Sequence, residues 1–161
     1  MQGIGGESHG DGIQQYTYSQ EFIPRDSVIR EIQIDIDKNG IESGGFLNWN
    51  VTDKKGNIIS GGSISYEEVR DHAYTSLVLD KKVKFWRRYY INVSFDKVNG
   101  IYPKIIVNHG EEQILEGQKL FCNGELLKGQ GLVWAIEYEE CVPLRLKVRI
   151  LLFILISAIM K

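Results

Sequence analysis

The residues from Arg88 to Asp96 read RYYINVSFD, and side chains suited to a core alternate with polar ones through this stretch. Successive side chains of an extended chain point to opposite faces, so a period of two is typical of a strand with one buried face. The side chains expected to face the core are Tyr89, Ile91, Val93 and Phe95. The sequence therefore predicts a half-buried β-strand here.

The same alternation occurs earlier in the chain. Two segments, 28–36 and 47–51, each place apolar side chains at alternate positions and polar ones between them. The apolar positions are Val28, Ile32, Ile34, Ile36, Leu47, Trp49 and Val51. A turn-forming sequence, DKKGN, follows at 53–57 and separates the second segment from Ile58. We therefore expect further half-buried strands joined by short turns.

Later segments continue the pattern. A strand is expected near 74–79, and others in YPKIIVN, in QKLFC and in GLVWAIEYEE, where Leu132, Trp134, Ile136 and Tyr138 share one face. The dipeptide Asn123-Gly124 is typical of a tight hairpin turn. Because no long amphipathic helix interrupts these segments, we predict an all-β fold, an antiparallel jelly-roll β-sandwich of about eight or nine strands over residues 16–141.

Composition limits the possible partners. The chain has 161 residues, enough for one domain, and its 19 Lys and Arg nearly balance its 21 Asp and Glu. Without a strongly basic surface, no nucleic acid is expected as a partner. The two cysteines, Cys122 and Cys141, lack the spacing of a zinc site, and we favour two free thiols over one disulfide.

The first fifteen residues, MQGIGGESHGDGIQQ, are rich in glycine and polar side chains. They contain no apolar run of the kind a signal peptide needs. We therefore expect residues 1–15 to form a flexible lead to the domain.

The C-terminal residues 144–161 read LRLKVRILLFILISAIMK. At about 1.5 Å per residue, the apolar run from Ile150 to Met160 covers only about half of a ~30 Å hydrocarbon core. We predict that residues 145–161 are the start of a transmembrane helix of a longer protein, with membrane lipid as a partner. A buried terminal helix and an interfacial helix are the alternatives, and the lack of a polar face over 150–156 argues against the second.

The segment from Asp35 to Gly40, DIDKNG, matches the opening of a calcium-binding loop. The match ends there, because Phe46 occupies the place of the bidentate glutamate and a strand-like pattern precedes the segment. We therefore interpret it as a polar bend between two strands, with a non-helical calcium site at Asp35, Asp37 and Asn39 as the alternative. No other cofactor is expected.

Taken together, about three quarters of the chain resembles a known kind of module. Five segments occur in the order seen in galactose-binding-like, carbohydrate-binding-module-like jelly rolls. They are QEFIPRDSVIREIQIDI, GGFLNWNVTDKKGNII, ISYEEVRDHAYTSLVL, RRYYINVSF and LFCNGELLKGQGLVWAIEYEE. Similar modules lie in extracytoplasmic loops of bacterial multipass envelope proteins. The resemblance implies a domain on the extracytoplasmic side of a cell membrane, next to a membrane-protein partner and with glycan as a ligand.

The basic residues Arg145, Lys147 and Arg149 give a different indication of sidedness. A positive flank beside a membrane span by itself favours the cytoplasm, although long domains cross membranes largely regardless of it. A cytoplasmic, tail-anchored β-domain is therefore a further alternative.

Sugar binding usually needs an exposed aromatic ring beside amide, carboxylate or guanidinium groups. The segment KFWRRYYIN supplies this combination, and the candidate ligand-binding residues are Trp86, Arg87, Arg88, Tyr90 and Asn92. The structural alternative is that Trp86 caps the core and the two arginines form a solvated or lipid-facing edge. Trp49 and Trp134 are assigned to the core because of their alternation.

No catalytic motif is evident. The acidic pairs are adjacent in sequence, and neighbours on a strand point to opposite faces, so they do not form the facing carboxylates that glycan hydrolysis needs. We expect a non-catalytic accessory domain of a membrane protein that binds cell-envelope or extracellular carbohydrate. The alternative is a structural or protein-interaction module that packs on its own membrane domain or on a partner.

Overall fold

The computed structural model describes residues 6–109 and 118–139. These residues form strands and no helix, which confirms the all-β prediction. The strands are β1 (Glu7–His9), β2 (Thr17–Phe22), β3 (Val28–Asp37), β4 (Phe46–Asp53), β5 (Ile58–Ser65), β6 (Ala73–Lys82), β7 (Tyr89–Phe95), β8 (Lys104–His109), β9 (Leu120–Cys122), β10 (Glu125–Leu127), β11 (Gln130–Leu132) and β12 (Trp134–Tyr138). Four three-residue strands, β1, β9, β10 and β11, raise the number above the predicted eight or nine.

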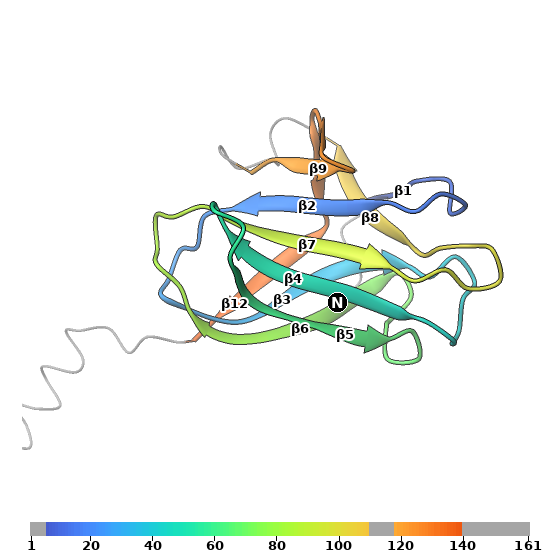
Figure 1. Ribbon diagram of the computed structural model, residues 1–161, viewed down its shortest axis with the longest axis horizontal. Coiled ribbons are helices and arrows are strands. Elements are labelled where there is room, and N and C mark those ends of the chain that lie inside the picture. The colour runs from blue at the N-terminus through green and yellow to red at the C-terminus, as the bar shows by residue number, and fades with distance from the viewer. Residues whose placement is uncertain (1–5, 110–117, 140–161) are drawn as a thin grey trace, which may run out of the picture.

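The strands form two antiparallel sheets (Figure 1). In one, here the β7 sheet, the order is β10-β9-β2-β7-β4-β5. In the other, here the β3 sheet, the order is β1-β8-β3-β12, with β11 paired to β8 and β6 paired to β3. The two sheets lie one behind the other in Figure 1, so the molecule is a β-sandwich. The jelly-roll topology stays a prediction.

The core lies between the sheets. On β7 the predicted side chains Tyr89, Ile91, Val93 and Phe95 are all buried, and the residues between them are half-buried on the outer face. The β3 sheet contributes the buried residues Ile32, Ile34, Ile36 and Leu77. Apolar surface removed from water stabilises the fold by about 25 cal/mol per Å², so these alternating side chains hold the two sheets together.

The start of β3 differs from the predicted pattern. We expected Val28 on the buried face, but Val28 is half-buried and Ile29 is fully buried. The pairing with β6 shifts register between Ile29 and Glu31. A bulge of this kind adds one residue to a strand and exchanges the faces on its two sides. Because Val28 and Ile29 are both apolar, the sequence does not show which of them faces the core or where the bulge lies.

The β3 sheet is forked. β8 pairs with only the last residues of β3 and then pairs with β11, while β12 takes its place beside the rest of β3. At the branch, the N–H of Val133 donates to the carbonyl of Ile106, and the carbonyl of Val133 accepts the N–H of Asp35, each at 3.0 Å. Among the described strands, β12 pairs with β3 along one edge only. Its other edge pairs with no described strand and is called the open edge below.

The loops gather at two ends of the sandwich. The basic end carries loops 23–27, 54–57 and 83–88, which contain Arg25, Lys54, Lys55, Lys84, Arg87 and Arg88 and one acidic residue, Asp26. The acidic end carries loops 38–45, 66–72 and 96–103, which contain five acidic residues, Glu42, Glu67, Glu68, Asp71 and Asp96, and three basic ones, Lys38, Arg70 and Lys97. The basic end is at the left of Figure 1 and the acidic end at the right. Antiparallel strands place alternate connections at opposite ends, which explains the separation.

The N-terminal residues are more ordered than we predicted. Glu7–His9 forms β1 and pairs with β8. The carbonyl of Gly12 accepts the N–H of Tyr102 at 2.8 Å. The described part of the expected flexible lead 1–15 therefore belongs to the sandwich, which corrects the prediction for these residues.

Two predictions concern residues outside the described part of the chain. They are the apolar helix at 145–161 and the free thiol of Cys141. Over residues 6–109 and 118–139, no helix with the length and apolar character needed to cross a membrane was found.

Candidate functional site

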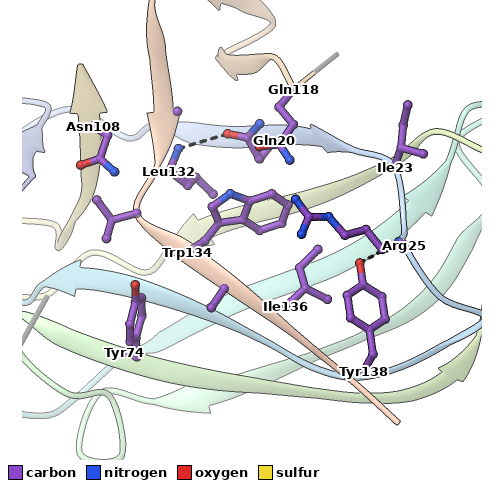
Figure 2. Close-up of a pocket in the computed structure, with 13 residues that line it drawn as sticks. Gln20, Ile23, Arg25, Tyr74, Asn108, Gln118, Leu132, Trp134, Ile136 and Tyr138 are labelled. Atoms are coloured by element: carbon purple, nitrogen blue, oxygen red, sulfur yellow. Dashed lines mark hydrogen bonds between the residues drawn. The ribbon is translucent and has the colours of Figure 1, made fainter. Parts of the chain in front are cut away.

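A cleft of about 360 Å³ runs along the open edge of β12. Its walls come from β12, the loop after β2, the end of β8 and the segment before β9. Six side chains that line it, shown in Figure 2, are Arg25, Asn108, Gln118, Trp134, Ile136 and Tyr138. Sites for small ligands are commonly about 300–1,000 Å³. We name this feature the β12 cleft.

Trp134 forms one wall of the β12 cleft. Its ring meets the buried ring of Phe22 nearly edge to face, with centroids 5.5 Å apart and an interplanar angle of 72°. This contact fixes the indole against the core while part of it stays accessible. The sequence assigned Trp134 to the core, and its side chain does pack against the core. It is only partly buried, because it lies where the sheet opens.

The amide groups in the cleft differ in their availability. The buried Gln20 accepts the N–H of Leu132 at 3.1 Å and donates to the carbonyl of Glu21 at 3.0 Å, so its amide joins β2 to β11. In the described part of the chain, no hydrogen bond involves the side chains of Asn108 or Gln118. These two amides are therefore available to a ligand.

Arg25 and Tyr138 are joined at the other end of the cleft. The backbone N–H of Arg25 donates to the Tyr138 hydroxyl at 3.0 Å (Figure 2). Burial raises the pKa of Tyr138, so the phenol is neutral in ordinary buffers. This bond ties the loop after β2 to β12, while the guanidinium of Arg25 reaches towards β12 from that loop.

The sequence-predicted sugar site is partly assembled at the basic end. Trp86 lies in the loop between β6 and β7, as predicted, and 81% of its surface is exposed. It therefore does not cap the core, which corrects the structural alternative. Its φ of 67° lies in the left-handed region, which few non-glycine residues adopt. Trp86, Arg87 and Arg88 line a groove of about 660 Å³, together with Lys54, Lys55, Lys82 and Lys84.

One carboxylate, Asp53, stands among the residues that line this groove. Its Oδ1 accepts the N–H groups of Lys55 at 2.8 Å and Asn57 at 3.0 Å, and its Oδ2 accepts the Asn57 amide at 2.9 Å. Hydrogen bonds from Asn57, with smaller help from Lys55, hold the pKa of Asp53 below its ordinary value. The hydrogen bonds of the Asp53 carboxylate therefore stabilise the turn between β4 and β5.

Arg88 and Tyr90 meet at a buried carboxylate. Glu21 is 2% exposed, and its Oε2 accepts the Tyr90 hydroxyl at 3.0 Å and lies 3.7 Å from a guanidinium nitrogen of Arg88. Burial and the bond to Glu21 raise the pKa of Tyr90. The other oxygen, Oε1, has no hydrogen-bond partner in the described structure. These two predicted residues therefore hold Glu21 on the outer face of the β7 sheet.

Asn92, the last predicted sugar-binding residue, lies further along that outer face. Its amide nitrogen donates to Asn50 at 2.9 Å and to Thr52 at 3.2 Å on the neighbouring strand. The five predicted residues therefore do not form one site. Trp86, Arg87 and Arg88 share the groove, whereas Tyr90 and Asn92 make contacts within the sheet.

The DIDKNG segment begins in β3, which ends at Asp37, and only its last three residues lie in the bend to β4. In that bend Asn39 and Gly40 adopt positive φ angles of 54° and 78°. Asn39 donates its side-chain amide to the carbonyl of Tyr102 at 3.1 Å. Asp37 instead lies with Asp71 and His72, whose possible ligand atoms are all within 4.8 Å of one another. Calcium binding stays a prediction.

Asp37 and Asp35 have different surroundings. Burial tends to raise the pKa of Asp37, but hydrogen bonds from Ser8 and Asn39 prevail and lower it. Asp35 is 5% exposed, its Oδ1 has no partner in the described structure, and burial raises its pKa. The first carboxylate is thus stabilised in its ionised form, whereas the second is not.

The thiol of Cys122 is free and buried, as predicted. Burial raises its pKa, so it behaves as a small apolar side chain.

Sequence reasoning missed the β12 cleft. Arg25 and Gln118 gave no motif, and Trp134 and Tyr138 were read as one apolar face of a strand. The sequence did not show the fork in the β3 sheet. The sheet opens where β3 changes its partner from β8 to β12, and these pairings join residues far apart in the chain. A scan against protein-family models and a search of the curated proteins found no match to this sequence.

Proposed function

We propose that this domain is a non-catalytic module that binds carbohydrate in the β12 cleft, on the extracytoplasmic side of a cell membrane. One observation carries the binding proposal: the partly accessible indole of Trp134 lines a cleft that also holds free amides and a guanidinium. An aromatic ring offers an apolar face to the C–H groups of a sugar, and amide and guanidinium groups pair with its hydroxyls.

The position of these groups supports the proposal. Phe22 fixes the Trp134 ring, and the bond to Tyr138 fixes the loop that carries Arg25. A site held in place before binding loses less conformational entropy when a ligand arrives. The described residues that line the cleft include amide, guanidinium and aromatic side chains, which are groups that bind a sugar.

The membrane location is carried by the sequence alone. The apolar run from Ile150 to Met160 and the resemblance of residues 20–140 to extracytoplasmic modules both support it.

The experiment is a titration of the full chain with a panel of neutral and charged oligosaccharides, followed by calorimetry. We expect saturable binding that falls at least tenfold in Arg25→Ala and in Gln118→Ala. Both changes affect side chains without a described structural bond, so folding should be intact, and circular dichroism checks this. Trp134→Phe is a third variant that keeps a ring against Phe22.

Trp86→Ala is the matched comparison, because it removes an exposed ring outside the cleft. Glycan binding that survives Trp86→Ala and fails in Arg25→Ala supports the β12 cleft. The reverse result would reject it in favour of the groove at the basic end. Each titration is repeated with calcium and with a chelator, since a calcium requirement would support the predicted site at Asp35, Asp37 and Asn39.

A docking module without a glycan ligand is the second candidate function. It is favoured by three exposed apolar side chains at the basic end, Ile58, Phe85 and Trp86. A folded chain that binds no member of the panel would move the assignment to this function.

A further inference from the structure

The basic end combines exposed aromatic rings with cations. Trp86 is 81% exposed and Phe85, its neighbour at the tip of the loop, is 56% exposed, with ring centroids 6.1 Å apart. Ile58, at the start of β5, is 69% exposed. Aromatic rings are favoured at the boundary between water and hydrocarbon, where Lys and Arg keep their charge at the headgroups.

The loop that carries the rings is anchored at its base. The N–H of Val83 donates to the carbonyl of Ser27 at 2.7 Å, and the N–H of Lys84 donates to the Tyr89 hydroxyl at 2.9 Å. Trp86, whose backbone is in the left-handed region, comes two residues after the second of these hydrogen bonds in the sequence. The exposed rings thus project from a fixed base.

Cations outnumber carboxylates around the rings, because loops 23–27, 54–57 and 83–88 hold six Lys and Arg residues and one acidic residue, Asp26. In the described structure, no salt bridge involves Lys54, Lys84 or Arg87. Arg88 lies near the buried Glu21, and the one carboxylate in the groove, Asp53, is bonded within its own turn. The surface therefore attracts anions.

The path of the chain places this end near the predicted membrane segment. The N–H of Glu139, the last described residue, donates to the carbonyl of Val28 at 3.1 Å, so the chain leaves β12 at the basic end (Figure 1). The ten residues 140–149 then separate it from the apolar run at 150–160. Ten residues span at most about 35 Å. A membrane that takes up the apolar run would thus be within reach of the basic end.

We propose that the basic end docks on an anionic lipid surface. In this arrangement Phe85 and Trp86 lie at the level of the headgroups, and Lys54, Lys84 and Arg87 contact lipid phosphates. The exposed cations supply the attraction to anionic lipid, and the rings supply the apolar contact. This proposal is independent of glycan binding in the β12 cleft.

The test measures where Trp86 lies when the full chain is bound to vesicles. Vesicles contain phosphatidylcholine alone or an equimolar mixture with phosphatidylglycerol, and a brominated lipid in each quenches nearby tryptophan emission. The Trp86→Phe variant gives the background from Trp49 and Trp134. The difference between the two proteins reports Trp86 alone, even if residues 145–161 bind every vesicle.

On the anionic vesicles we expect the brominated lipid to quench the emission of Trp86. We also expect Trp86 to be protected from acrylamide, a quencher that stays in the water. High salt should reduce both effects because it screens the attraction. The triple variant Lys54→Glu/Lys84→Glu/Arg87→Glu should weaken this docking at least about a hundredfold, since each basic residue near an anionic surface contributes about fivefold.

The matched control reverses exposed cations elsewhere, in Arg70→Glu/Lys97→Glu/Lys128→Glu. It changes the net charge equally and should leave Trp86 quenching in place. The proposal is overturned if Trp86 stays as accessible to acrylamide on anionic vesicles as in buffer, a result expected if this end binds a protein instead. It is also overturned if the two triple variants behave alike.

Discussion

The two ends of the sandwich are both built from loops between antiparallel strands, yet they use their charged groups differently. At the acidic end the carboxylates hold the loops together. Asp96 accepts the N–H of Phe46 at 3.2 Å and the amide of Asn48 at 3.0 Å, and Asp71 accepts the N–H of Lys38 at 2.7 Å. At the basic end, Lys54, Lys84 and Arg87 form no salt bridge with any described residue.

The same difference holds for the aromatic side chains. Tyr66 at the acidic end is completely buried and donates its hydroxyl to the carbonyl of Asp96 at 2.7 Å, whereas Phe85 and Trp86 at the basic end are exposed. The acidic end thus uses its side chains for stability, and the basic end keeps them available. Changes at the first should alter unfolding, and changes at the second should alter binding.

The largest expected effect is at Tyr66. Tyr66→Ala removes a buried ring and its hydrogen bond, and we expect it to lower the free energy of unfolding by about 3–5 kcal/mol. Phe85→Ala is the matched change at the basic end and should cost less than about 0.5 kcal/mol. Urea denaturation of both variants measures the difference. Equal losses would show that the two ends do not differ in this way.

Asp37→Asn should have the next largest effect. The folded-state pKa of Asp37 is lowered, so its ionised form contributes stability above the ordinary value of 3.8, and this contribution is lost as the pH falls through the lowered pKa. We expect a loss of about 1–3 kcal/mol at neutral pH. Denaturation across the acidic range should show that the gap to the wild type closes with acid. A constant gap would contradict the role of the charge.

Asp35→Asn should act in the opposite direction. The pKa of Asp35 is raised in the folded state, so burial of its ionised form opposes folding at a pH above that raised pKa. At neutral pH we expect the variant to be more stable by about 1 kcal/mol. As the pH falls through the raised pKa towards 3.8, the wild type gains stability and the advantage disappears. Thermal unfolding at several pH values tests this, and a destabilised variant at neutral pH would refute it.

The smallest effect on stability should come from the basic end. We expect Lys54→Glu/Lys84→Glu/Arg87→Glu to change the free energy of unfolding by less than about 0.5 kcal/mol per substitution, because these side chains are exposed and form no salt bridge in the described structure. Urea denaturation checks this alongside the vesicle measurements. A large loss would mean that these cations have a structural role.

Much of the fold could be predicted from local patterns. The alternation over 89–95 correctly identified the buried face of β7, and Asn123-Gly124 forms the predicted turn between β9 and β10 with φ angles of 49° and 84°. Both features depend on residues close together in sequence. The bulge at the start of β3 was missed because Val28 and Ile29 are both apolar, and either one could have faced the core.

The candidate site was less predictable. The sequence indicated the aromatic and basic character of 84–90, but not that Tyr90 would bond to Glu21, which lies far away along the chain. It also placed Trp134 in the core without any sign of the cleft beside it. Exposure of a side chain depends on which strands become neighbours, and strand order is set by distant pairings.

The sequence by itself determined that this chain forms strands, which face of β7 is buried and where one tight turn lies, because side-chain alternation and turn preference act over a few residues. Only the tertiary structure decided that β8 and β12 share β3, that a cleft opens beside Trp134, and that loops 54–57 and 83–88 combine their cations at one end. These features depend on contacts between residues far apart in the chain, and the packing of the whole sandwich selects them.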